Sequence, residues 1–191
     1  MARPRVTEAE AVLDAAEHVL VARGIADTTV DDVAAGAGVS RATVYRYLGG
    51  KNEIVAAVIG RATQELLDSM EPLIAEATTP HGLIESIVTS AADSVEASPL
   101  LARLNNEDRR ETLAYITVDG APLIDLVVES LGDTLRNSIA FQIDLTRLDT
   151  ALEEATRLVI SHLTTPRSDG GRLSSLELGE RVATMVVPLL G

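Results

Sequence analysis

The part of this sequence that most constrains its fold is residues 28–51, TTVDDVAAGAGVSRATVYRYLGGK. The stretch opens with two threonines that can cap a helix, Thr28 and Thr29. Two acidic residues that suit the positive end of a helix dipole follow, Asp31 and Asp32. Gly38 then permits the positive φ that ends many helices, and Ser40 is a good N-cap for a second helix. The pattern predicts two short helices joined by a three-residue turn.

Three apolar or small residues in this stretch indicate how the two helices cross. Ala34 is small where the second helix must approach, Gly38 lies in the turn, and Val44 faces inward from the second helix. A steep crossing over a short turn needs residues of these kinds, so a helix-turn-helix is predicted.

With Val39 and Val44 turned inward, the second predicted helix presents polar and basic side chains outward: Arg41, Thr43, Tyr45, Arg46 and Tyr47. Two tyrosines beside two arginines are unusual on a solvated helix, whereas base edges and phosphates offer all four a partner. Double-stranded DNA is therefore the expected ligand of this helix. The alternative is a helical hairpin whose arginines only keep the protein in solution.

Beyond the motif, the sequence resembles the tetracycline-repressor (TetR) family over about residues 7–59. The resemblance rests on VLVARG (19–24), TTVDDVA (28–34), AGVSRATVYRYL (37–48) and GKNEIV (50–55). It implies a dimeric, ligand-responsive transcription regulator, usually a repressor. Leu48 and Ile25 depart from the family, which often has aromatic residues at both positions.

The resemblance also assigns roles to individual residues. The positions that resemble base-reading or groove-facing ones are Arg41, Thr43 and Arg46. The positions that resemble phosphate contacts are Thr29, Tyr45, Tyr47 and Lys51. Ser40, at the start of the same helix, completes the predicted DNA-binding set.

The net charge of −13 is unusual for a nucleic-acid-binding protein, so its distribution matters. Residues 1–51 carry six basic and seven acidic side chains, a net charge of −1, and the remaining residues carry −12. The acidity thus lies almost wholly outside the motif, where it would repel DNA away from the docking face. Arg3 and Arg5, in a short N-terminal arm, either reach DNA or are disordered without it.

Composition and spacing give no support to catalysis. The chain has no cysteine, and its three histidines, His18, His81 and His162, have no metal-ligand partner at a recognisable spacing. Sequence motifs for nucleotide binding or acyl transfer are absent. We therefore expect no enzymatic activity, no cofactor and no metal. The polar N-terminus and short apolar runs predict a cytoplasmic protein without signal peptide or membrane segment.

The rest of the chain is expected to be helical, which makes the predicted fold class all-α. Apolar residues three or four apart predict one long helix over residues 52–77. Prolines and stripes of apolar residues predict further helices near 81–96, 99–105, 107–117, 121–141, 147–164 and 174–190. We expect a helix-turn-helix DNA-binding domain at 1–51 and a helical effector-binding and dimerisation domain at 52–191.

The last two predicted helices, 147–164 and 174–190, carry apolar stripes with small residues at Ala155, Gly179 and Ala183. Such stripes either close the core of a single chain or meet a symmetry mate in a four-helix interface. Two reading heads on a palindromic site require a dimer, so we expect a homodimer through these helices.

An effector of unknown identity is expected to bind among the helices between 52 and 143. Few aromatic residues lie outside the motif, which favours an aliphatic or small polar effector over a flat aromatic one. Candidate lining residues are His81, Asn105, Asn106, Arg109, Arg110, Tyr115, Phe141 and Gln142. The competing hypothesis is a helical dimer that binds a small molecule and has lost specific DNA recognition.

Overall fold

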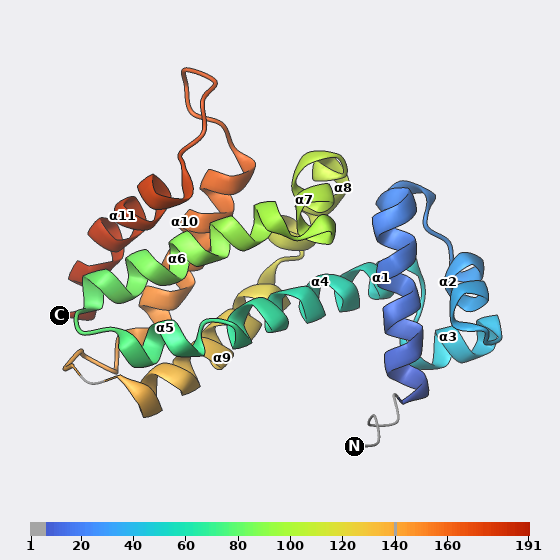
Figure 1. The fold of residues 1–191 in the computed structure, drawn as a ribbon, viewed down its shortest axis with the longest axis horizontal. Helices are drawn as coiled ribbons and strands as arrows, with labels where there is room; N and C mark the ends of the chain where they lie inside the picture. Colours follow the sequence, from blue (N-terminus) through green and yellow to red (C-terminus); the bar gives the residue numbers. More distant parts are fainter. Residues whose placement is uncertain (1–6, 140) are drawn as a thin grey trace.

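The computed structural model describes residues 7–139 and 141–191, and all regular secondary structure in these residues is helical. The all-α prediction is confirmed. α1 (Glu8–Asp27), α2 (Val30–Ala37) and α3 (Arg41–Tyr47) form a compact group at one end of the molecule (Figure 1). α4 (Lys51–Asp68) leads from this group to the remaining helices.

The larger group of helices packs around and beside α4 (Figure 1). Its elements in chain order are α5 (Glu71–Glu76), α6 (Pro80–Ala97), α7 (Pro99–Asn106), α8 (Arg109–Leu113), the π-helical turn η1 (Ala114–Val118), α9 (Ala121–Ser138), α10 (Leu148–Thr164), α11 (Ser175–Val186) and the 3₁₀ turn η2 (Val187–Leu190). The ends of α6, α7 and α10 lie within one or two residues of their predicted positions.

α1 begins at a capping box and contains a kink near its end. Thr7 and Glu10 form the capping box, in which each side chain binds the other residue's backbone N–H. Gly24 lies in the kink with φ 82°, and helical turns resume to Asp27. Thr28 is buried and its hydroxyl donates to the Gly24 carbonyl oxygen at 2.6 Å, so only Thr29 caps α2.

The predicted long helix over 52–77 is wrong: it is broken between α4 and α5 at Ser69 and Met70. Pro72 has no N–H to donate to the carbonyl of residue 68, and its ring would clash with that carbonyl. The proline is tolerated because it stands in the first turn of α5, where a backbone N–H has no helical partner.

Two other predicted helices are also divided. The segment predicted as 107–117 consists of α8 and the wider turn η1. The segment predicted as 174–190 is α helical only to Val186, because Pro188 cannot donate to the helix, and a 3₁₀ turn follows.

Two hydrophobic cores hold the chain together. The first joins α1, α2, α3 and the first half of α4, and it also includes Leu100 and Leu104 of α7. The second joins α4, α5, α6, α9, α10, α11 and η2. Because α7 contributes to the first core, the DNA-facing end of the chain is packed directly against the larger helical group.

Within the described residues, no helix combines the length and the apolar character needed to cross a lipid bilayer.

Candidate DNA interface and effector cavity

The orientation of α3 follows from one buried side chain and two capping residues. Val44 is fully buried among α1, α2 and α4, which fixes the inward face of α3. Gly38 ends α2 in the left-handed region at φ 67°, and its N–H binds back to that helix. The Ser40 hydroxyl accepts the backbone N–H of Thr43 at 3.2 Å and so begins α3. These contacts turn the remaining side chains of α3 outward.

The predicted recognition residues lie on this outward face. Arg41, Tyr45, Arg46 and Tyr47 are exposed, and Thr43 is half-buried. Tyr45 and Tyr47 are 51% and 39% exposed, which are large exposed fractions for aromatic side chains. The structure therefore brings the predicted base-reading and phosphate-binding side chains of α3 together on one surface.

Acidic side chains of the same domain neutralise this surface in the absence of DNA. Arg41 Nε pairs with Asp31 at 3.0 Å, and Arg46 Nη2 pairs with Glu8 at 3.4 Å. The Tyr47 hydroxyl donates to Glu8 at 2.8 Å, and the Arg46 guanidinium lies 4.6 Å from the centre of the Tyr47 ring. Hydrogen bonding to Tyr47 raises the pKa of Arg46 above its ordinary value. If Arg41 and Arg46 bind DNA as predicted, phosphates or bases would have to replace Asp31 and Glu8 as their partners.

The other predicted DNA-binding residues have structural contacts. The Thr29 hydroxyl donates to the Asp32 carboxylate at 2.6 Å and caps α2. Lys51 Nζ donates to the Ala26 carbonyl oxygen at 2.5 Å, so it caps the end of α1. Their DNA-binding roles stay predictions. Arg3 and Arg5, proposed to reach DNA, lie outside the described residues.

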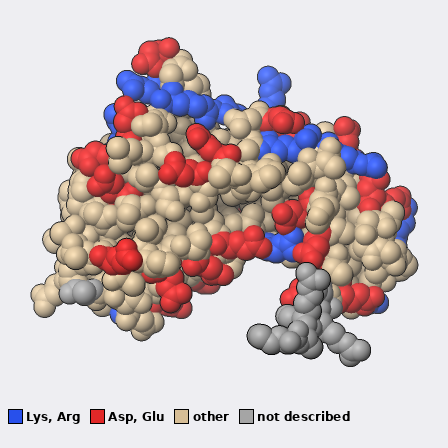
Figure 2. Space-filling view, in the orientation of Figure 1, with Lys and Arg blue, Asp and Glu red and all other residues tan. Residues whose placement is uncertain are grey.

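Charged side chains of both signs lie on the face seen in Figure 2. Acidic side chains are spread over both halves of the face seen in Figure 2, and the basic side chains form separate clusters between them. Because residues 52–191 carry a net charge of −12, we expect the larger helical group to repel DNA.

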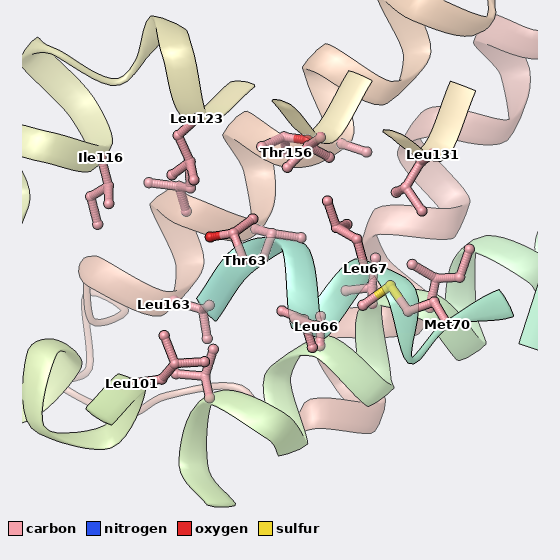
Figure 3. A pocket seen from close by; sticks show the side chains of 18 of the residues that line it. Thr63, Leu66, Leu67, Met70, Leu101, Ile116, Leu123, Leu131, Thr156 and Leu163 are labelled. Atoms are coloured by element: carbon pink, nitrogen blue, oxygen red, sulfur yellow. The ribbon is translucent and has the colours of Figure 1, made fainter. Parts of the chain in front are cut away.

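A cavity of about 240 Å³ lies inside the larger helical group. Side chains from α4, α7, α9 and α10 point into it, among them Leu66, Leu101, Leu131 and Leu163 (Figure 3). Among the described residues, every side chain that lines it is aliphatic or a methionine apart from four threonines, Asn105 and Arg109. The aliphatic preference expected from the sequence is consistent with this lining.

The cavity contains two of the candidate ligand-binding residues, Asn105 and Arg109. The remaining candidates do not line it: His81, Asn106, Arg110, Tyr115, Phe141 and Gln142. Phe141 packs against the second core, and Gln142 is exposed. Sequence reasoning missed Thr112, which lines the cavity and is buried, since a lone threonine gives no signal in a sequence.

A second feature that the sequence did not reveal is the corner formed by residues 103–115, which we call the α7–α8 corner. Asp108 accepts the backbone N–H of Ile25 at 3.2 Å, directly after the Gly24 kink, and pairs with Arg103 Nε at 3.2 Å. Arg103 Nη1 also donates to the Val21 carbonyl oxygen at 3.2 Å. The corner therefore supplies hydrogen-bond partners to backbone groups of α1, although the two segments are far apart in the sequence.

The α7–α8 corner also contacts the start of α4. The Tyr115 hydroxyl donates to Asn52 Oδ1 at 3.2 Å. Burial raises the pKa of Tyr115, and the carboxylates of Glu53 and Asp119 raise it further, so the hydroxyl is neutral. The corner thus touches the DNA-facing end through Asp108 and Tyr115 and the cavity through Arg109 and Thr112.

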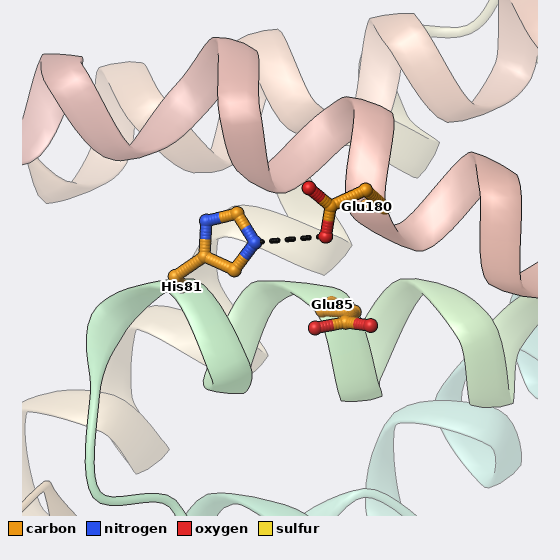
Figure 4. Close-up of side chains that lie close together, drawn as sticks. All are labelled: His81, Glu85 and Glu180. Carbon is orange, nitrogen blue, oxygen red and sulfur yellow. Dashed lines mark hydrogen bonds and ion pairs between the residues drawn. The ribbon is translucent and has the colours of Figure 1, made fainter.

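His81 lies on the surface of α6 and faces α11 (Figure 4). Its Nε2 is 3.0 Å from Glu180 of α11, and Glu85, one turn further along α6, completes a group whose ligand atoms lie within 4.8 Å of one another. The sequence predicted no such group, because Glu180 is distant along the chain. The His81–Glu180 hydrogen bond links α6 to α11.

Part of the apolar stripes of the last two helices packs within the chain, and their role in an interface with a second copy stays a prediction. Gly179, Val182 and Ala183 are buried against α6, and a Cβ at residue 179 would lie 2.6 Å from the Glu85 carbonyl oxygen. Several apolar residues of the α10 stripe line the cavity. The exposed apolar residues of this region are Leu176, Met185 and Leu189.

Two family models match the chain. Residues 12–58 match "Bacterial regulatory proteins, tetR family", and residues 75–188 match "Bacterial Tetracyclin repressor, C-terminal domain". The first match covers the helix-turn-helix, and the second covers the helices that enclose the cavity together with α4.

Individual proteins resemble the chain over parts or all of its length. It is 34% identical over 131 residues to two regulators of Pseudomonas putida, the HTH-type transcriptional regulator SrpR and the uncharacterized HTH-type transcriptional regulator TtgW. In both cases the match covers 65% of this chain, but it spans only about half of SrpR (55%) and most of TtgW (88%). The crystal structure of AlkX, a TetR family repressor from Dietzia sp. strain DQ12-45-1b, shares the fold with a TM-score of 0.76 and 23% identity, covering 99% of this chain and 100% of that one.

Proposed function

Because the chain belongs to the TetR family and is a transcriptional regulator with a helix-turn-helix DNA-binding domain, we propose that it is a ligand-responsive repressor. In this proposal residues 1–51 bind DNA, and residues 52–191 bind a small-molecule effector and dimerise. The protein acts in the cytoplasm, where it binds a pseudo-palindromic operator as a homodimer. AlkX, which has the same fold, is itself a repressor.

The observation that carries the proposal is the outward face of α3. Arg41 and Arg46 project from a helix whose opposite side is anchored by the buried Val44, so the backbone from which both side chains extend is held in place. Guanine presents two acceptors in the major groove, which suit a bidentate arginine. We assign base contacts to Arg41 and Arg46, and phosphate contacts to Tyr45, Tyr47 and Lys51.

Dimerisation follows from the proposed operator. A pseudo-palindrome presents two half-sites in successive major grooves, and each requires one recognition helix. We place the interface on the outer faces of α10 and α11. The exposed apolar side chains Met185 and Leu189 support this assignment.

The α7–α8 corner offers a physical link between effector and DNA. Arg109 and Thr112 line the cavity, and they lie on the same short helical segment as Asp108, whose carboxylate accepts the backbone N–H of Ile25. An effector bound in the cavity would contact this segment. A shift of this segment would move α1 and with it α3. The effector can change DNA affinity only as far as it binds the two states with different affinity.

Selection of the purified protein against a random pool of duplex DNA tests the proposal. We expect enrichment of an inverted repeat whose half-sites are one or more helical turns apart. A folded dimer that enriches no sequence would contradict specific DNA binding and favour the hypothesis of a small-molecule-binding dimer without DNA recognition.

A further inference from the structure

Most of the polar side chains that line the cavity are engaged within the protein or closed off from the cavity. Thr156 and Thr164 donate their hydroxyl groups to the carbonyl oxygens four residues earlier in α10, so they offer methyl groups to a ligand. The Thr112 hydroxyl oxygen is buried and has no surface open to the cavity. Arg109 Nε donates to the Asn105 carbonyl oxygen at 2.9 Å. Almost the whole surface that faces the cavity is apolar.

Branched aliphatic side chains supply most of this apolar surface. Leu66 of α4, Leu101 of α7, Leu131 of α9 and Leu163 of α10 surround the space from different sides (Figure 3). A water molecule needs two to four polar partners, and a wall of this kind supplies few of them. The cavity therefore favours a molecule that needs no hydrogen bonds.

We propose that the effector is an uncharged hydrocarbon that binds this cavity without a polar head group. A hydroxyl or amide group buried there would lose its hydrogen bonds to water without gaining others, and a carboxylate or ammonium group would lose far more. The sequence left aliphatic and small polar effectors open, and the apolar wall favours only the first. This inference rests on the proposed function, because it names the ligand class of the proposed regulator.

The cavity volume limits the size of the hydrocarbon. An apolar cavity of about 150 Å³ holds benzene, so 240 Å³ accommodates about ten non-hydrogen atoms in proportion. n-Octane lies within this limit and is volatile, which makes it the probe for the experiment.

Headspace gas chromatography of n-octane over solutions of the purified full-length chain would measure its affinity, because bound hydrocarbon leaves the vapour. We expect saturable binding with one molecule per chain. Across the series n-hexane, n-heptane and n-octane, each added methylene group should tighten binding about fourfold, as burial of one methylene group predicts. Affinity that does not rise with chain length would contradict binding by apolar burial.

Competition against n-octane tests the absence of a head-group site. 1-Octanol and octanoate carry an alkyl chain of the same length with a hydroxyl or a carboxylate group. At neutral pH, 1-octanol should bind at least about fivefold more weakly than n-octane, and octanoate at least about a hundredfold more weakly, because the cavity offers no replacement for their hydrogen bonds to water. Binding of either competitor as tight as that of n-octane would overturn the proposal.

Ala91→Leu locates the binding site, because Ala91 of α6 lines the cavity. The larger side chain should occupy part of the cavity and weaken n-octane binding at least about tenfold. The same change should raise the Tm of the free protein by about 2–4 °C, since it buries more apolar surface. Ala97→Leu is the matched control: Ala97 is exposed at the end of the same helix and lies outside the cavity, so n-octane affinity should not change. Full n-octane affinity in a folded Ala91→Leu variant would place the hydrocarbon elsewhere.

Thr63→Val tests whether a cavity hydroxyl serves as a polar anchor. The substitution replaces the hydroxyl with a methyl group of similar size. Neither n-octane nor 1-octanol should lose affinity. A selective loss of 1-octanol affinity would identify a hydrogen-bonding head-group site at Thr63 and would overturn the proposal.

Binding to the selected operator, measured with and without n-octane, separates this inference from the proposed function. We expect n-octane to weaken operator binding. Operator binding by a chain that does not bind n-octane would overturn only the ligand class. n-Octane binding without any operator binding would overturn the regulator function and leave the preference of the cavity in place. n-Octane binding that leaves operator affinity unchanged would overturn the role of a hydrocarbon as effector.

Discussion

Arg46 is the residue on which the proposed sequence preference depends most. It is exposed in the last turn of α3, and its only ion pair in the described residues is the solvated contact with Glu8. Arg46→Ala should cost about 1–3 kcal/mol of operator binding and relax the preference at one base pair. A binding assay on the operator and single-base variants would measure both effects. A uniform loss over all sequences would instead identify Arg46 as a phosphate contact.

Glu8 gives a second prediction at the residue scale. Its carboxylate accepts hydrogen bonds from both Arg46 and Tyr47, so it competes with DNA for the same side chains. Glu8→Gln should tighten DNA binding modestly, by less than about 1 kcal/mol, because exposed ion pairs are weak. Fluorescence anisotropy with labelled operator would detect the change. Glu71→Gln, at the start of α5, is the matched control, and equal tightening there would point to general charge repulsion.

At the scale of helices, the Gly24 kink in α1 and the α7–α8 corner form one unit. Asp108 lies against the kink, and a Cβ at Gly24 would approach the Asp108 carboxylate to 2.7 Å. Gly24→Ala should therefore destabilise the protein by about 1–3 kcal/mol, through both its positive φ and this close contact. Urea unfolding would measure the loss. Gly60→Ala, on helix α4 where nothing lies within 4 Å of an added Cβ, should be neutral or stabilising.

Asp108 carries the prediction about communication between helices. Asp108→Ala would leave the Ile25 N–H and the Arg103 Nε without the carboxylate that accepts their hydrogen bonds, at a cost of about 1–3 kcal/mol in stability. If the corner transmits the effector signal, this variant should bind ligand while its operator affinity no longer responds to it. Operator titrations with and without a ligand that is shown by calorimetry to bind the chain would test this. A full ligand response in the variant would exclude Asp108 from the link.

At the scale of the whole molecule, DNA affinity should depend on dimerisation. Met185 is 54% exposed on α11, outside the buried stripe that packs on α6. Met185→Glu should disrupt the proposed dimer while the chain remains folded, and operator binding should fall because each chain contributes one recognition helix. Sedimentation and circular dichroism would measure assembly and folding. A folded variant that stays dimeric would move the interface away from this face of α11.

The sequence by itself determined the DNA-facing end, because its signals are local. Capping by Ser40, the positive φ at Gly38 and the inward Val44 all fall within residues 38–44, and the structure has them as predicted. The break before Pro72 is also a local effect, because the missing N–H acts within one helical turn, but the apolar spacing over 52–77 does not record it.

Tertiary structure alone decided what the larger group of helices does. A stripe of apolar residues has the same appearance whether it faces a core, a cavity or another chain, so only the packing of α11 on α6 showed where the stripe of Gly179 and Ala183 lies. The contact of Asp108 with Ile25 joins residues that are far apart in the sequence, and the Thr112 hydroxyl is buried without a partner among such segments. No local pattern records such relations, because they arise from the close packing of distant segments.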